Sequence, residues 1–231
     1  MAIPLIIAHR GASAEKPENT LGAFQRAIAL KADGIELDVQ LSCDGVPVVF
    51  HDTDLRRLTR QRGRLTAKAW PELQKFRILG SKEGIPSLLD VLKSTRGRIV
   101  VQIELKRGVT VAPVIAVIKK ARAASWVILA SFKQNLLRDA AELAPTIPRM
   151  VIAEGRGLRS SLLRRLKACD ACGVSINHRA VREADYARYF QIRGFVVWCW
   201  TVNDAATAGR LTGWGIDGLV GDNPALLKRL F

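Results

Sequence analysis

Nine short apolar runs, most of them separated by a helix-length segment, constrain the fold of this 231-residue chain more than any other feature. Amphipathic segments such as TLGAFQRAIALKA and PVIAVIKKARAA lie between most of the runs. Strands that alternate with helices at this spacing are typical of parallel βαβ units. The runs cover residues 5–9, 34–41, 46–51, 99–106, 126–132, 149–154, 173–177, 195–202 and 218–222.

The second and third runs break this alternation. Only residues 42–45 separate them, whereas a parallel crossover needs about a dozen residues or more. Asp44-Gly45 is also a strong hairpin signal. We therefore expect the third run to return antiparallel to the second, as a hairpin extension at the carboxyl-terminal rim of the sheet.

The other eight runs predict a single α/β domain over residues 1–231, folded as a (β/α)8 barrel of the TIM type. Each of these strands is followed by a candidate helix, and the last helix is expected to begin at Pro224 in PALLKRLF. The longest connection, residues 53–85, is expected to contain a short helix in AKAWPELQKF.

The hairpin predicts where the polar side chains of the second strand meet a histidine. If Asp44-Gly45 is a two-residue turn, Asp38 lies opposite His51. Alternate residues share a face, so Glu36, Asp38, Gln40 and His51 are expected on one side, at the rim where such barrels place active sites. A slip of one residue would turn His51 to the other face.

Two other strands end at the same rim with reactive side chains. His9 and Arg10 follow the first strand, and Glu104 and Lys106 alternate at the end of the IELK run. Together with the two acids of the second strand, Glu104 offers oxygen ligands that suit Mg2+ or Ca2+, and such a cation would keep the three acids ionised. Arg10 and Lys106 suit an anionic group such as phosphate, and two histidines can exchange protons near neutral pH.

Structural roles compete with these functional ones. A histidine at the end of a strand, such as His9, is often structural, and two acids in one strand can form structural ion pairs. The joint pattern favours a site, because two of the three histidines accompany acids at strand ends. His178 has no acid or basic cluster near it in the sequence, and it is expected to be structural or peripheral. The HExxH pattern of zinc hydrolases is absent from the sequence.

The net charge and the composition exclude few classes of binding partner. A net charge of +15 favours anionic partners such as nucleic acid, an acidic lipid surface or a phosphorylated substrate. A small-molecule partner is expected and nucleic acid is not, since the sequence contains no nucleic-acid-binding motif. No apolar run reaches the roughly 18 residues of a membrane helix, and the sequence shows no export signal. We therefore expect a cytoplasmic protein. In that compartment disulfides are rare, so the four cysteines are expected to be reduced.

Five segments, in order from His9 to Pro224, together resemble the motif series of glycerophosphodiester phosphodiesterases, a family of the PLC-like phosphodiesterase superfamily. The segments are HRGASAEKPENTLGAF, GIELDVQLSCDGVPVVFHD, IELK, VVWCWTVND and GIDGLVGDNP. The resemblance implies a TIM-type barrel that hydrolyses glycerophosphodiesters to sn-glycerol 3-phosphate and an alcohol such as choline or ethanolamine. It also implies one divalent cation, Mg2+ or Ca2+, and acid–base catalysis by histidine.

The resemblance further implies a role for each matching residue. The assignments are Glu36, Asp38 and Glu104 as metal ligands, His9 and His51 as catalytic acid and base, Arg10 and Lys106 beside the phosphate, Trp200 beside the glycerol or the metal, and Glu18 and Asn19 as braces of the first loop. Helix capping by Asn19 or Thr20 explains the last segment equally well.

Two alternative functions remain open at this point. The first is a lysophospholipase D-type phosphodiesterase acting on lysophospholipids, and the more remote one is a basic nucleic-acid-binding protein. The connection at residues 53–85 looks shorter than in many relatives, which leaves the preferred alcohol undetermined, and the sequence does not predict the oligomeric state.

Overall fold

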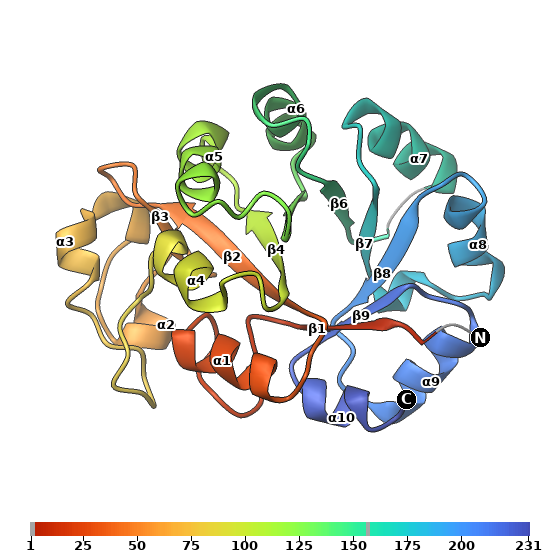
Figure 1. Ribbon diagram of the computed structural model, residues 1–231, viewed down its shortest axis with the longest axis horizontal. Coiled ribbons are helices and arrows are strands. Elements are labelled where there is room, and N and C mark those ends of the chain that lie inside the picture. Colours follow the sequence, from red (N-terminus) through yellow and green to blue (C-terminus); the bar gives the residue numbers. More distant parts are fainter. Residues whose placement is uncertain (1–2, 156–157) are drawn as a thin grey trace.

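A closed barrel of eight parallel strands forms the centre of the computed structural model, which describes residues 3–155 and 158–231 (Figure 1). Around the barrel the strands follow the order β1, β2, β4, β5, β6, β7, β8 and β9, and β9 pairs with β1 to close it. The ninth strand, β3, pairs antiparallel to β2 outside the ring. The strands are β1 (Leu5–Ala8), β2 (Gly34–Leu41), β3 (Pro47–Val49), β4 (Val100–Leu105), β5 (Val127–Ser131), β6 (Arg149–Ala153), β7 (Gly173–Asn177), β8 (Val196–Trp200) and β9 (Gly218–Gly221).

Helices cover the outside of this barrel (Figure 1). They are α1 (Leu21–Ala29), α2 (Arg56–Thr59), α3 (Trp70–Leu73), α4 (Leu88–Thr95), α5 (Val111–Lys120), α6 (Gln134–Leu143), α7 (Arg159–Ala168), α8 (Asp185–Gln191), α9 (Ala205–Gly213) and α10 (Pro224–Lys228), with 3-10 turns η1 (Leu65–Ala67) and η2 (His178–Ala180). The predicted TIM barrel is confirmed, every predicted strand is present, and α10 begins at Pro224 as expected.

Side-chain caps explain where several helices begin. The Thr20 hydroxyl accepts the amide of Ala23 at 3.1 Å at the start of α1. Ser87 and Asp90 form a capping box at α4, and the Asn223 side chain caps α10 just before its first-turn proline. These caps satisfy amides that lack a partner within the helix.

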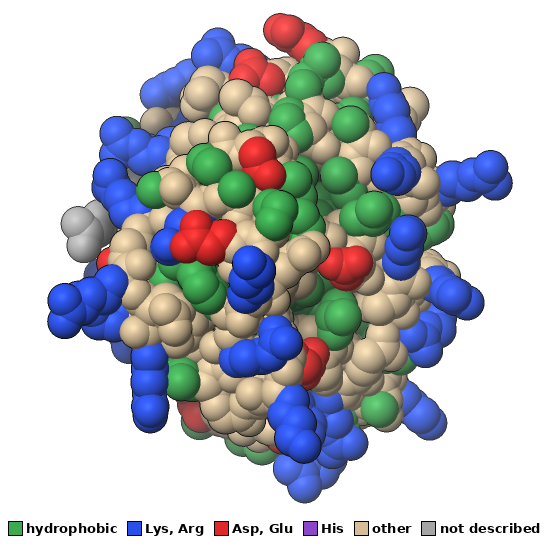
Figure 2. Space-filling model, turned by 90° about the vertical axis from the view of Figure 1, so that its left-hand side faces the viewer, with side chains coloured by type: hydrophobic (Ala, Val, Ile, Leu, Met, Phe, Trp, Pro, Cys, Tyr) green, Lys and Arg blue, Asp and Glu red, His purple; other side chains and the backbone are tan. Residues whose placement is uncertain are grey.

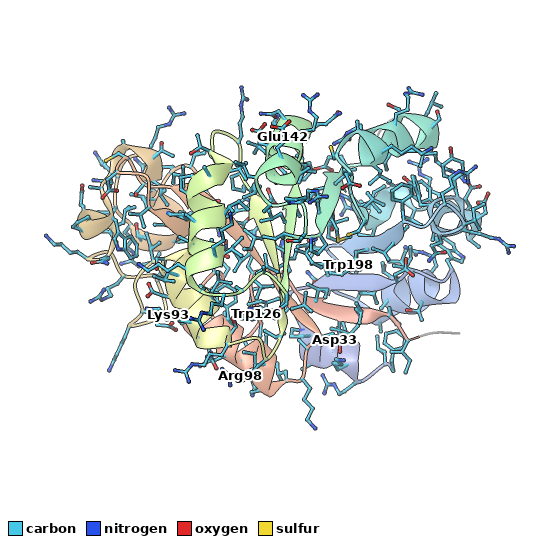
Figure 3. All side chains as sticks on the ribbon, turned by 45° about the horizontal axis from the view of Figure 1, so that its top comes forward. Asp33, Lys93, Arg98, Trp126, Glu142 and Trp198 are labelled. Atoms are coloured by element: carbon cyan, nitrogen blue, oxygen red, sulfur yellow. The ribbon has the colours of Figure 1, made fainter. Side chains whose placement is uncertain are left out.

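Two apolar layers stabilise the barrel. The larger lies between the strands and the helices, and a separate cluster inside the barrel contains Ile7, Met150, Trp198 and Val220 (Trp198 is labelled in Figure 3). Strand alternation produces the two layers, because successive side chains point outward and inward.

Asp33 fastens the last helix to the first strands at the amino end of the barrel (Figure 3). Its Oδ2 accepts the backbone N–H of Ile6 at 2.7 Å, and Lys228 of α10 donates to both carboxylate oxygens at 2.7 and 2.9 Å. One carboxylate therefore joins elements from both ends of the sequence.

The hairpin register differs by one residue from the prediction. Val39 pairs with Val49, and the N–H of Phe50 donates to the carbonyl of Asp38 at 2.9 Å. Asp38 therefore lies opposite Phe50, and the predicted pairing of Asp38 with His51 is wrong. The strand β3 ends at Val49, so His51 lies beyond it.

A three-residue turn causes this shift. The N–H of Ser42 donates to the carbonyl of Val46 at 3.0 Å, which leaves Cys43, Asp44 and Gly45 in the loop. Gly45 takes the left-handed conformation with φ +81°, as in the common hairpin in which a type I turn precedes a left-handed residue. Asp44-Gly45 fits this turn as well as the two-residue turn that we expected.

Basic side chains project around the edge of the face shown in Figure 2, with acidic and apolar side chains between them. None of the described helices is long and apolar enough to cross a membrane. All four cysteines are free thiols, as predicted.

Candidate active site

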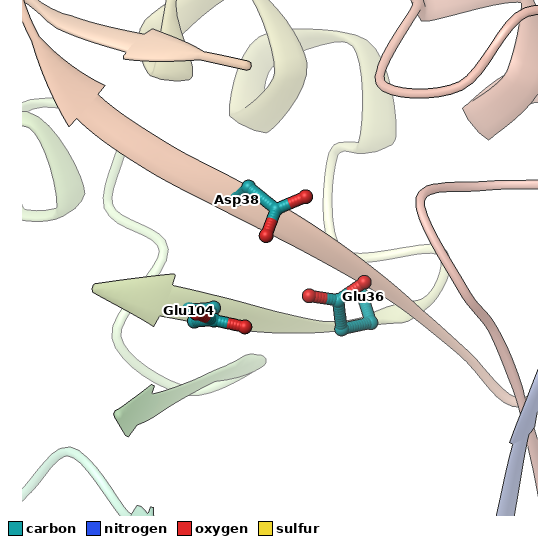
Figure 4. Close-up of side chains that lie close together, drawn as sticks. All are labelled: Glu36, Asp38 and Glu104. Carbon is teal, nitrogen blue, oxygen red and sulfur yellow. The ribbon is translucent and has the colours of Figure 1, made fainter. Parts of the chain in front are cut away.

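Three carboxylates converge inside the barrel (Figure 4). Glu36 and Asp38 lie two residues apart on β2, and Glu104 lies opposite Asp38 on the neighbouring strand β4. One carboxylate oxygen from each lies within 4.8 Å of the other two. Glu36 is 6% exposed and Asp38 is 1% exposed, so their charges are costly unless another group compensates them.

The pKa values of the three acids show this cost. Burial and the neighbouring charge of Asp38 raise the pKa of Glu36 to about 8. The same two causes raise the pKa of Glu104. Burial also opposes ionisation of Asp38, yet Lys106 and Arg10 hold its pKa below the usual value. An oxygen-only donor set with this much repulsion fits a hard divalent cation such as Mg2+ or Ca2+.

Two cationic side chains flank the cluster. Lys106 Nζ lies 2.7 Å from Glu104 Oε1 and 3.2 Å from Asp38 Oδ1. Arg10 Nε lies 3.3 Å from Asp38 Oδ2, and the Arg10 backbone N–H donates to Glu36 Oε2 at 3.1 Å. Both side chains border the cavity and can bind an anionic group there.

His9 lies directly after β1 and is oriented by an acid at the end of β9. Its Nδ1 is 2.6 Å from Asp222 Oδ1, and its Nε2 is 4.0 Å from Glu36 Oε2. Ser13 and Asn203 also donate to Asp222, at 3.2 and 2.5 Å. Burial lowers the pKa of His9, but the hydrogen bond to Asp222 and the charge of Glu36 outweigh it, so the pKa is raised.

His51 reaches the cavity by a route that differs from the predicted one. Its Nδ1 lies 2.7 Å from Asp52 Oδ1. The side-chain amide of Gln40 on β2 donates to the carbonyls of Phe50, His51 and Asp52 at 2.8, 3.2 and 2.7 Å. This amide holds the segment that carries the imidazole at the rim, beyond the last strand-pairing bond, from the Phe50 N–H to the Asp38 carbonyl.

A cavity of about 280 Å³ joins these groups to an aromatic wall. Trp200 at the end of β8 and Phe132 after β5 meet edge to face, with ring centroids 5.9 Å apart. The Trp200 indole donates to the carbonyl of Ser175 at 3.0 Å, which fixes its orientation. Glu154, after β6, also lines this cavity.

The predicted braces of the first loop touch the site directly. Asn19 is 1% exposed and donates to Asp38 Oδ2 at 2.9 Å. Glu18 accepts a hydrogen bond from the Arg10 guanidinium at 2.9 Å. Thr20 rather than Asn19 caps the following helix, so capping explains Thr20 and contact with Asp38 explains Asn19.

Four further residues bond to the groups of the site, and no role was predicted for them from the sequence. They are Gln40, Asp52, Arg57 and Asp222. The two acids had a detectable signal, because each follows a strand or a candidate catalytic histidine, and such imidazoles usually bond to a carboxylate. His178 lies in η2 and lines a different surface cavity, consistent with the expected peripheral place.

Known proteins resemble this chain over nearly its whole length. The profile of the Glycerophosphoryl diester phosphodiesterase family matches residues 9–226. A glycerophosphodiester phosphodiesterase from Caldanaerobacter subterraneus is 34% identical over 98% of this chain and 97% of its own length. A second relative of that name, from Bacillus subtilis, is 29% identical over 98% of this chain and 86% of its own length.

Solved structures of such phosphodiesterases share the fold of this chain. An Oleispira antarctica phosphodiesterase in complex with the product sn-glycerol-3-phosphate superposes with a TM-score of 0.92 at 29% identity, covering 99% of this chain and 96% of that one. A Thermotoga maritima glycerophosphodiester phosphodiesterase gives 0.86 at 27% identity over all of both chains. With a profile match that begins at His9 and ends within α10, and relatives aligned over most of their length, this chain belongs to the glycerophosphoryl diester phosphodiesterase family of enzymes.

Proposed function

We propose that this enzyme hydrolyses glycerophosphodiesters to sn-glycerol 3-phosphate and an alcohol, using one divalent cation and two histidines. The observation that carries the proposal is the convergence, in and beneath one cavity, of three carboxylates within 4.8 Å and two imidazoles that are each paired with a further carboxylate. The product bound by the Oleispira antarctica relative supports the substrate class. We further propose that residues 1–231 act as one catalytic domain; a cytoplasmic location remains a prediction from the sequence.

Glu36, Asp38 and Glu104 would hold the cation, Mg2+ or Ca2+. When bound, it would stabilise the negative charge that develops on the phosphoryl oxygens. Arg10 and Lys106 bind the phosphate oxygens from the side, and their links to Asp38 keep them in place. Trp200 supplies an apolar surface for the carbon atoms of the substrate.

The two histidines move protons in both halves of the reaction. The glycerol 2-hydroxyl oxygen attacks phosphorus while one imidazole takes its proton. The other imidazole gives a proton to the alcohol oxygen as the bond from that oxygen to phosphorus breaks. Water then opens the cyclic phosphate by the reverse transfers, which leaves sn-glycerol 3-phosphate. In each histidine Nδ1 faces a carboxylate, so Nε2 is the nitrogen available to substrate.

The proposal is tested with metal-stripped enzyme and glycerophosphocholine. We expect no turnover until Mg2+ or Ca2+ is added, and Glu36→Gln should weaken both the response to metal and the rate. Glu142→Gln, on the exposed side of α6, is the matched control. Full activity in the presence of a strong chelator would contradict the proposed metal dependence.

A second arm tests the histidines and the substrate class. His51→Ala should lower kcat by about 10²–10⁴-fold without changing the thermal unfolding midpoint. Lysophosphatidylcholine is assayed beside glycerophosphocholine, and a clear preference for it would favour lysophospholipids as the substrate class.

A further inference from the structure

Arg57 in α2 bridges two carboxylates. Its Nε and Nη2 donate to Asp52 Oδ2 and Oδ1 at 2.5 and 3.1 Å. Its Nη1 and Nη2 donate to Glu18 Oε2 and Oε1 at 2.8 Å each. The planar fork of a guanidinium suits such paired bonds, and a lysine cannot reproduce them.

Each of these carboxylates orients a different residue of the site. Asp52 Oδ1 lies 2.7 Å from His51 Nδ1, and Glu18 Oε1 accepts Arg10 Nη1 at 2.9 Å. A continuous line of contacts therefore runs from His51 through Asp52, Arg57 and Glu18 to Arg10. It connects the loop after β1 with the segment after β3, which are distant in sequence.

Arg57 itself is not among the residues that line the 280 Å³ cavity. Any effect on the reaction must therefore pass through Asp52 and Glu18. Among the described residues, the side-chain hydrogen bonds of Asp52 join only His51 and Arg57, and those of Glu18 join only Arg10 and Arg57. Loss of Arg57 would leave each carboxylate free to rotate away from its partner.

We infer that Arg57 is a positioning residue that sets the orientation of the His51 imidazole and of the Arg10 guanidinium together. This inference rests on the proposed function of those two residues. The backbone near His51 is held independently by the Gln40 amide, so removal of Arg57 should misplace side chains while the loop stays in place.

The exposure of Arg57 separates this role from a structural one. Its side chain is 48% exposed, and ion pairs this exposed add little to stability because water and salt screen them. A role in stability alone would therefore change the unfolding midpoint only slightly, and kcat would fall only in step with the midpoint. A positioning role predicts a loss of kcat at an unchanged midpoint.

The test compares Arg57→Ala with Arg56→Ala, which removes an exposed neighbour whose side chain bonds to neither carboxylate. We expect Arg57→Ala to lower kcat by about 10-fold or more and to raise KM, because Arg10 also loses its support. The kcat of Arg57→Lys should lie between the values of Arg57→Ala and Arg56→Ala. Guanidinium ion, well below concentrations that unfold proteins, should partly restore Arg57→Ala and have no effect on Arg56→Ala.

The possible failures are distinguishable. If the wild-type enzyme is active and Arg57→Ala behaves like Arg56→Ala, the inference is overturned and the proposed function stands. Loss of kcat in step with a lower unfolding midpoint, without rescue by guanidinium, would assign Arg57 a structural role and also overturn it. A wild-type enzyme that hydrolyses no glycerophosphodiester with either cation would remove the proposed function, and this inference with it.

Discussion

Two carboxylates on one strand acquire opposite electrostatic character from their immediate neighbours. Asp38 contacts Asn19, Lys106 and Arg10, and these groups outweigh its burial and lower its pKa. Glu36 is equally enclosed but faces the charge of Asp38, which raises its pKa. Both are carboxylates on the same face of β2, so their different surroundings account for the opposite shifts.

Glu36 predicts how the stability of the metal-free enzyme depends on pH. Its pKa in the folded protein, about 8, lies above its ordinary value, so the unfolded state loses this proton first as pH rises. Stability is therefore full below the ordinary pKa of a glutamate and declines as pH rises towards about 8. We expect the unfolding midpoint in chelator to fall across this range.

Differential scanning fluorimetry from about pH 5 to 9 measures this slope. Mg2+ or Ca2+ should raise the midpoint most at the alkaline end, and Glu36→Gln should flatten the slope. An unchanged slope in Glu36→Gln would show that another group causes it.

The identities of the central side chains were predictable, whereas the contacts that orient them were not. Parallel strands end at one rim and alternate residues share a face, so Glu36, Asp38 and Glu104 could be grouped from sequence. The Asp222 to His9 contact joins the two ends of the chain. Its geometry depends on the closed barrel, which the pattern of apolar runs does not specify in atomic detail.

At the scale of elements, the direction of the hairpin was predictable and its register was not. Short connections force strands to return antiparallel, but Asp44-Gly45 fits two turn lengths, and these differ by one residue in pairing. The segment after β3 was harder still. The short helix predicted in AKAWPELQKF is present as α3, Trp70–Leu73. The helix α2, also four residues long, was not predicted, because a helix this brief shows no helical periodicity.

The observed turn predicts the effect of replacing Gly45. Its φ of +81° disfavours a residue with a side chain, and nothing lies within 4 Å of an added Cβ, so any cost comes from the backbone. Gly45→Ala should destabilise the enzyme by about 1 kcal/mol, and Gly45→Asn by less, because asparagine tolerates this conformation.

Urea denaturation measures the two stabilities, and kcat should hardly change because Gln40 fixes His51 separately. A large loss of kcat in Gly45→Ala would instead mean that the turn itself places the imidazole.

Across the whole molecule, barrel closure depends on contacts between the first and last parts of the chain. Asp33 makes one of these contacts, since it bonds to Ile6 and Lys228 together. The eight-stranded closure could be predicted from the count of strands, whereas this particular link could not. It joins residues whose proximity exists only after the barrel has formed.

Asp33→Ala should lower the free energy of unfolding by about 1–3 kcal/mol, because the Ile6 N–H and the Lys228 ammonium lose a charged partner. Asp33→Asn should cost less, since its amide oxygen still accepts from Ile6. Both variants should keep their kcat, as Asp33 lies at the amino end of the barrel, away from the cavity. Equal stability of all three proteins in urea would show that the link contributes nothing.

Apart from Glu154 after β6, the acids, bases and cations of the site come from adjoining strands, β9, β1, β2 and β4, and from the segment held by Gln40. The aromatic wall comes from the loops and ends of β5 to β8. Reactivity and shape selectivity are thus encoded by separate arcs of the same ring. A mutant library confined to the second arc could therefore be screened for activity on diesters of other alcohols while the catalytic residues stay unchanged. This separation suits directed evolution.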